Sequence, residues 1–291
     1  RDFQRNSRGV APSFGYPLTP DLRLSGGYTL EEIQISTDLQ ATNSGPALFN
    51  LNRGGLNSAV NLSLSYDTRD NRLFPTRGQY HVLSTEVSDS SLLADAAMEY
   101  RRFRLSARYY HPLFWELVLK LNSSFGLIYG GDYGVPISER FFPGGIFSVR
   151  GFEPRGLGPT IPVMNKGDPY GPTSQFTVGG NKEAIFNLEI EFPILAAAGI
   201  KGVLFADAGN AYDDDQGFFY LGLSDDEKPV AYSRQKNKEI APPLGLYYSV
   251  GLGFRWFSPI GPLRFEWGFP LTKRDLDDRD SIFEFTIGNF F

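Results

Sequence analysis

The 291-residue sequence has no cysteine, only two histidines and a net charge of −5. Without cysteine, neither a disulfide nor a thiolate metal site can form. Two histidines leave little material for histidine-based catalysis. The acidic balance argues against nucleic acid as a partner, because phosphate binding needs a basic face. No apolar run approaches the roughly 18 residues that a membrane-spanning helix requires.

Aromatic residues and glycine are abundant instead. The chain contains 25 Phe, 15 Tyr and 32 Gly, and aromatic residues make up 15% of it. Short segments of about ten residues alternate between apolar and polar side chains, which is typical of β-strands with two different faces. In one such segment Phe103, Leu105 and Ala107 alternate with arginine and serine. Helix signals are few, so the sequence predicts an all-β chain.

Two all-β architectures produce this alternation. In a soluble sandwich the apolar faces pack against each other, whereas in a membrane barrel they meet lipid and the polar faces line the lumen. Three features favour the barrel: aromatics such as Trp115 and Trp256 at strand ends, short turns alternating with long loops, and glycines and charges on the polar faces. We therefore predict a transmembrane antiparallel β-barrel.

The strand count suggests that residues 1–291 are part of a barrel. About eleven strands can be counted, and the first and last would then start and end on opposite rims. Single-chain bacterial barrels have an even number of strands. We therefore expect an odd number of strands upstream of Arg1. The abrupt start at Arg1 also resembles a cut into a longer protein.

The longest interval without a strand pattern runs from about residue 129 to 180 and contains FFPGGIFSVRGFEPRGLGP. Its Val149-Arg150-Gly151-Phe152 resembles the VRGF signature in the sixth extracellular loop of the outer-membrane insertase superfamily. Further segments resemble that family in its own order: DTRDNRLFPTRG, VGGNKEAIFNLEIEFPI, LFADAGNAY, SPIGPLRFEWGFPL and FEFTIGNFF. The first sixty residues match only loosely.

The resemblance implies a sixteen-stranded barrel of which this chain holds strands six to sixteen, without the first strands and the periplasmic POTRA modules. It also implies that the loop folds into the lumen, where Arg150 pairs with Glu189 of strand twelve and Asp207 of strand thirteen. The chemistry is coherent, because a guanidinium can bridge two carboxylates that would otherwise repel each other. Glycine at 151 permits a tight turn beside the arginine, and Phe152 would pack on the lumen wall.

The last strand carries alternating aromatics, and the resemblance implies that it is the seam strand whose open edge pairs with client strands. The seam residues are Phe283, Phe285, Ile287, Gly288 and Phe291. The implied function is folding and insertion of other β-barrel proteins into the bacterial outer membrane. The implied partners are unfolded barrel clients, accessory lipoproteins and outer-membrane lipid.

Other candidates are weaker. The acidic runs at 213–215 and 225–227 lack calcium-loop spacing, and His81 and His111 have no paired ligand pattern. No nucleophile with its base, phosphate loop or metal cluster is apparent, so we expect no enzyme, no cofactor and no metal. Two alternatives stay open: a two-partner secretion transporter of the same superfamily, and a porin-like channel.

Overall fold

The structure is a computed structural model, and it describes most of the chain. The described residues are 4–36, 40–41, 54–92, 97–131, 134–164, 174–224, 226–233, 238–258, 261–274, 277 and 279–288. The main sheet consists of β1 (Gln4–Val10), β2 (Ser13–Pro17), β3 (Leu22–Ser36), β5 (Gly55–Asp67), β6 (Gly78–Ser88), β7 (Tyr100–Pro112), β8 (Val118–Gly130), β11 (Lys182–Leu195), β12 (Ile200–Tyr212), β15 (Tyr247–Ser258), β16 (Gly261–Pro270) and β18 (Ile282–Ile287).

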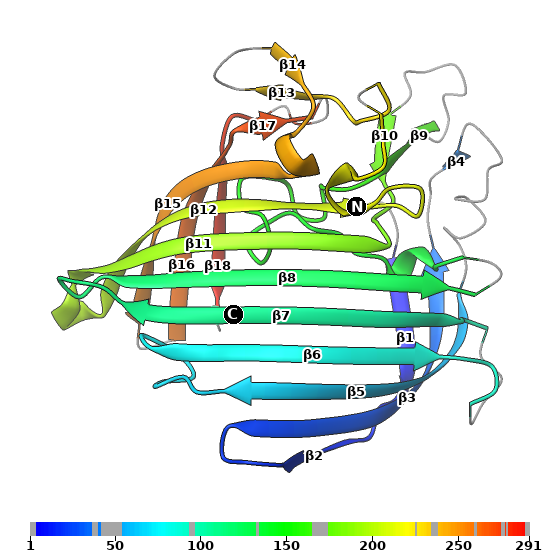
Figure 1. Cartoon of the computed structure of the whole chain (residues 1–291), viewed down its shortest axis with the longest axis horizontal. Helices are drawn as coiled ribbons and strands as arrows, with labels where there is room; N and C mark the ends of the chain where they lie inside the picture. Colours follow the sequence, from blue (N-terminus) through cyan, green and yellow to red (C-terminus); the bar gives the residue numbers. More distant parts are fainter. Residues whose placement is uncertain are drawn as a thin grey trace.

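These twelve strands occupy eleven positions in one antiparallel sheet. β1 and β2 both pair with the same edge of β3, at different heights, and Pro12 separates them because it has no N–H for the ladder. The order along the sheet is β1-β3-β5-β6-β7-β8-β11-β12-β15-β16-β18. The all-β prediction and the count of about eleven strands are confirmed. Figure 1 shows β5, β6, β7, β8, β11 and β12 side by side, with β16 and β18 passing behind them.

Smaller elements lie in the long connections. One three-stranded sheet contains β4 (Gln40–Ala41), β9 (Thr160–Met164) and β10 (Ser174–Thr177), and the other contains β13 (Ala231–Ser233), β14 (Lys238–Ile240) and β17 (Thr272–Lys273). The 3-10 turns are η1 (Ile137–Glu139), η2 (Ala196–Ala198), η3 (Phe218–Tyr220) and η4 (Pro243–Gly245). Among the described residues no helix is both long and apolar enough to cross a membrane. The strands β9 and β10 fall within 129–180, where the sequence showed no strand pattern.

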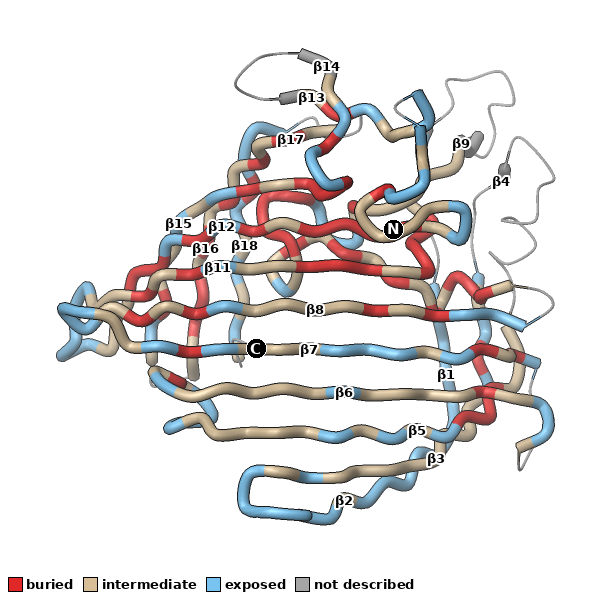
Figure 2. The backbone as a smooth tube through the Cα atoms, viewed as in Figure 1, coloured by how far each residue is buried: buried red, intermediate tan, exposed pale blue. Residues whose placement is uncertain are grey.

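The two faces of the sheet have inverted polarity. Large apolar side chains on one face are exposed, among them Leu62, Leu105 and Leu252, while charged side chains on the other face are buried, among them Glu189 and Arg255. Figure 2 shows the buried positions gathered on β11, β12, β15, β16 and the loop beside them. A soluble sandwich would bury the apolar face. The exposed apolar surface therefore suits contact with lipid, and the polar face lines an interior.

The turn between β5 and β6 is organised by one carboxylate. Asp70 Oδ1 accepts hydrogen bonds from the backbone N–H groups of Asn71 (2.9 Å), Thr76 (2.9 Å) and Arg77 (3.2 Å), and Asp70 Oδ2 accepts one from Thr76 Oγ1 (2.5 Å). Burial alone raises the pKa of this carboxyl, but the hydrogen bonds from Thr76 and Arg77 outweigh it, so the pKa lies below its ordinary value. The ionised form of Asp70 therefore stabilises the turn.

We predict that Asp70→Ala lowers the free energy of unfolding by about 1 kcal/mol at pH 7, because several turn amides lose their acceptor. This contribution is fully present above the ordinary Asp pKa of about 3.9 and is lost as the pH falls through the lower folded pKa. Urea unfolding of the detergent-solubilised protein at neutral and acidic pH measures it. Asp21→Ala is the control, because the described structure shows no hydrogen bond to the Asp21 carboxylate. Equal effects of the two variants would contradict the prediction.

Candidate functional site

The connection from β8 to β11, residues 131–181, is here called the inner loop. Its central part, 143–157, closes on itself through hydrogen bonds from Leu157 N to Pro143 O (3.0 Å) and from Gly145 N to Val149 O (3.1 Å). Asn187 of β11 holds the turn from outside the loop, since its Nδ2 donates to Ser148 O at 2.7 Å. The loop backbone is thereby shaped so that Arg150 faces the inner wall of the sheet.

The side chain of Arg150 lies among three acids from three strands. Its Nε and Nη2 donate to the two carboxylate oxygens of Asp207 on β12, both at 2.6 Å, in a bidentate pair. Its Nη1 donates to Glu189 Oε1 on β11 (2.6 Å) and to Glu266 Oε2 on β16 (3.0 Å). The backbone N–H of Arg150 also donates to Asp207 Oδ2 at 3.0 Å. The structure thus brings the three sequence-predicted charged residues together and adds a fourth.

The guanidinium of Arg150 is removed from solvent and remains charged. Its Cζ lies 3.6 Å from the centroid of the Phe205 ring, within the range of a cation–π contact. Arg150, Glu189 and Asp207 are each 2% exposed. Burial alone lowers the pKa of Arg150, but the negative charges of Asp207 and Glu189 raise it by more, so the pKa lies well above its ordinary value. Arg150 can therefore act only as a fixed cation.

Gly151 lies directly against the backbone of β16. Its φ is +83°, and a Cβ built on it would lie 3.0 Å from the carbonyl carbon of Gly268. A Cβ on Gly268 would lie 2.3 Å from the Gly151 nitrogen. Two facing glycines are therefore needed for the loop to approach the wall closely enough to seat Arg150.

Val149 and Phe152 flank the arginine with apolar contacts. Both are buried in a cluster with Leu157, Ile185 and Tyr247. The rings of Phe152 and Tyr247 meet edge to face, with centroids 5.9 Å apart. Phe152 packs on the wall as the sequence suggested, and every residue of the Val149–Phe152 motif contacts the wall or lies against it.

Arg150 belongs to a larger buried network, here called the lumen charge cluster. Its eight members are Lys120, Arg150, Glu189, Glu191, Asp207, Arg255, Arg264 and Glu266, and all are buried. Arg255 Nη2 lies 2.9 Å from both oxygens of Glu189 and 3.2 Å from Glu266 Oε1. Arg264 Nη2 donates to Glu266 Oε2 at 2.7 Å. With four cations and four acids, every buried charge is compensated.

Three members of this cluster, Arg150, Glu189 and Asp207, are predicted from the sequence. The other five lie on the polar faces of strands in which apolar and polar residues alternate; Glu266, for example, lies between Phe265 and Trp267. Alternation places such residues on the inner face. It does not say which cation reaches which acid, because that depends on the registers between strands.

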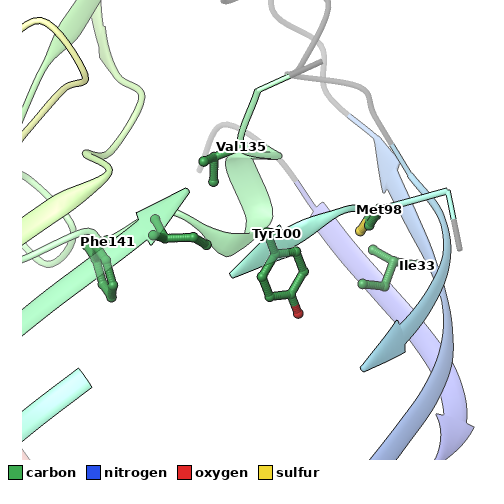
Figure 3. Packing of buried hydrophobic residues seen from close by; sticks show 6 residues of the cluster. Ile33, Met98, Tyr100, Val135 and Phe141 are labelled. Atoms are coloured by element: carbon green, nitrogen blue, oxygen red, sulfur yellow. The ribbon is translucent and has the colours of Figure 1, made fainter. Parts of the chain in front are cut away.

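The start of the inner loop is held at a second place. Glu139 of η1 accepts a hydrogen bond from Arg102 Nη2 of β7 at 2.5 Å, and Arg5 Nη2 of β1 lies 3.6 Å from its other oxygen. Figure 3 shows Val135 and Phe141 of the loop with Tyr100, Met98 and Ile33 in the apolar cluster close by. The loop is therefore anchored to β1 and β7 at its start and to β11, β12 and β16 at Arg150.

The predicted seam strand is β18, the edge strand that pairs with β16. The side chains of Phe283, Phe285 and Ile287 are about half exposed on the apolar face. Phe283 lies on Trp267 and Phe285 on Phe265, with ring centroids 4.6 and 4.8 Å apart. Gly288 has a φ of +115° and its N–H donates to Pro262 O at 2.9 Å. Phe291 lies outside the described residues.

In the described part of the chain, no group of three or more His, Asp or Glu side chains is placed so that it could hold a metal ion. His81 stacks on Tyr66 and His111 stacks on Tyr109. Asp213 forms an ion pair with Arg140, with 3.7 Å between Asp213 Oδ1 and Arg140 Nη1. Asp225 and the residues around 234–237 and 275–276 are not described.

The chain is similar to curated outer-membrane proteins. It is 30% identical to the outer membrane protein assembly factor BamA of Nitratidesulfovibrio vulgaris (strain Hildenborough), over 100% of this chain and 32% of that protein. It is 31% identical to the protein of the same name from Neisseria meningitidis serogroup B (strain MC58), over 76% of this chain and 27% of that protein. The chain therefore spans about a third of the length of these relatives.

Solved structures share its fold. BamA from Haemophilus ducreyi lacking POTRA domains 1–3 matches 98% of this chain and 54% of that chain, with a TM-score of 0.74 at 19% identity. CdiB from Acinetobacter baumannii matches 97% of this chain and 42% of that chain, with a TM-score of 0.54 at 14% identity. The prediction of an antiparallel β-barrel of the bacterial outer membrane is confirmed.

The model of the Omp85 superfamily domain matches residues 1–291. The match includes the inner loop with Arg150 as well as all three strands whose acids bind that arginine. The chain belongs to the Omp85 superfamily.

Proposed function

We propose that residues 1–291 form the C-terminal part of the barrel of an outer membrane protein assembly factor, which folds and inserts other β-barrel proteins. Two relatives about 30% identical to this chain carry that name. The observation that carries the proposal within this chain is the buried seat of Arg150, which holds the inner loop inside the barrel. The inner loop would act as a fixed internal brace.

The proposed site of assembly is the edge strand β18. An edge strand has unpaired backbone N–H and C=O groups, which can pair with an incoming strand. β18 pairs with β16 over only six residues, Ile282–Ile287. We propose Phe283, Phe285, Ile287, Gly288 and Phe291 as the seam residues at which an unfolded client strand would bind.

The proposed partners are unfolded outer-membrane barrel clients, Bam-type accessory lipoproteins and the surrounding outer-membrane lipid. Assembly would proceed without nucleotide or cofactor, driven by pairing of client strands and by burial of their apolar faces in lipid. POTRA modules and the first five strands are expected in sequence outside residues 1–291.

Two measurements separate this proposal from the alternatives. Purified full-length protein in proteoliposomes should speed the folding of an added unfolded β-barrel client, measured by the heat-modifiable mobility of the client. A porin-like channel would instead show high steady conductance in a planar bilayer and no effect on client folding. A two-partner secretion transporter would move a soluble polypeptide across the bilayer.

We expect Arg150→Ala to loosen the inner loop and to weaken client assembly. Removing the cation leaves the carboxylates of Glu189, Asp207 and Glu266 with fewer partners in a buried site, and breaking such a buried ion pair destabilises by about 3–5 kcal/mol. Limited proteolysis of the loop, together with the rate of client folding, measures both effects.

Arg155→Ala is the matched control, because Arg155 is an exposed arginine in the same loop that lies over the Phe142 ring. We expect its protease sensitivity and assembly rate to stay near those of the wild type. Normal protease resistance and a normal assembly rate in Arg150→Ala would refute the proposed role of the loop.

A second substitution tests the close approach of loop and wall. Gly151→Ala should also expose the loop to protease, because the added methyl meets β16 in addition to the strain of a positive φ, which amounts to about 1–2 kcal/mol. Gly222→Ala is the control, since Gly222 has a φ of +92° but nothing within 4 Å of its Cβ position. Protease cleavage is measured for each variant at the loop that carries the substitution. If Gly222→Ala exposes its own loop as much as Gly151→Ala exposes the inner loop, backbone strain alone explains the effect and the contact with Gly268 is unimportant.

A further inference from the structure

The inner loop also reaches the last strand of the sheet. The backbone N–H of Ile146 donates to Glu284 Oε1 of β18 at 2.8 Å. A Cβ built on the neighbouring Gly145 would lie 3.3 Å from the same oxygen. Ile146 lies four positions before Arg150 in the same loop, so a short segment connects the edge strand to the seat of Arg150.

The pairing of β18 with β16 contains an unfavourable pair at this height. Glu284 lies directly opposite Glu266 in the register of the two strands. Like charges at directly opposite positions weaken a strand pair. Glu266 is compensated by Arg150, Arg255 and Arg264, which lie within 3.2 Å of it. Among the described residues, Ile146 is the hydrogen-bond donor that Glu284 meets.

The two faces of β18 are therefore held by different means. On the apolar face, Phe283 and Phe285 stack on β16. On the inner face, Glu284 is bound by the loop. We infer that Glu284 is a positioning residue, through which the inner loop holds β18 in its place at the edge of the sheet. The contact between Ile146 and Glu284 is part of the fold and does not depend on the proposed function. Only the expected effect of Glu284 on client assembly rests on that function.

The experiment compares Glu284→Ala, Glu284→Gln and Thr286→Ala in the full-length protein by amide hydrogen exchange. Glu284→Ala should speed exchange about tenfold at residues 144–148, because the Ile146 N–H loses its acceptor. It should also speed exchange within β18 (Ile282–Ile287). Glu284→Gln should keep exchange near that of the wild type, since its amide oxygen still accepts.

Thr286→Ala is the control, because Thr286 is the next inward residue of the same strand and has no hydrogen bond to the loop in the described structure. It should leave exchange at 144–148 unchanged. Unchanged loop exchange in Glu284→Ala would overturn the contact. Faster loop exchange without faster exchange in β18 would overturn the positioning role.

Client assembly in proteoliposomes gives a separate readout. We expect Glu284→Ala to slow it several-fold, with Glu284→Gln restoring the rate, which a general loss of stability would not produce. If the wild-type protein folds no client, the proposed function fails while the exchange results still decide the role of Glu284. If the wild type is active and Glu284→Ala is equally active, positioning of β18 by the loop has no part in assembly.

Discussion

One buried guanidinium determines how the interior of this protein is organised. Arg150 enters the barrel on a loop and binds acids from β11, β12 and β16. Removing these charges from water is unfavourable, and only close pairing with good geometry offsets that penalty. The surrounding features serve this pairing: two glycines allow the loop to approach, and Phe205 covers the guanidinium. Arg255 shares Glu189 and Glu266 with Arg150 and also pairs with Glu191.

The distribution of polarity explains why such a network can exist. In most soluble proteins, charged side chains stay at the surface. Here the apolar face of the sheet is turned outward and the charges are turned inward, so the interior contains a cluster of paired ions beside several apolar clusters. The lumen charge cluster is held together by ion pairs and hydrogen bonds, while the apolar side chains of the outer face make their contacts with lipid.

Much of this architecture could be predicted from the sequence, because alternation has a strict period of two. The period placed Glu189, Arg255 and Phe283 on their faces, and the resemblance of the Val149–Phe152 motif led to Arg150 and its two acids. Glu266 was missed, because its contact with Arg150 depends on the registers of β12, β15 and β16, which no local pattern encodes. The contact of Ile146 with Glu284 was missed for a different reason. The donor is a backbone N–H, which every residue except proline carries, so no residue type in the sequence indicates this contact.

The compensation within the lumen charge cluster has a consequence for the response of the protein to salt. Its four cations and four acids are buried, so mobile ions have little access to them. At 0.1 M ionic strength the Debye length is about 10 Å, so salt largely screens exposed charges that lie farther apart than this, whereas buried pairs are screened much less. The buried ion pairs that hold the inner loop should thus be equally stable at low and at high salt concentration, which is useful for a molecule that faces the outside of a cell.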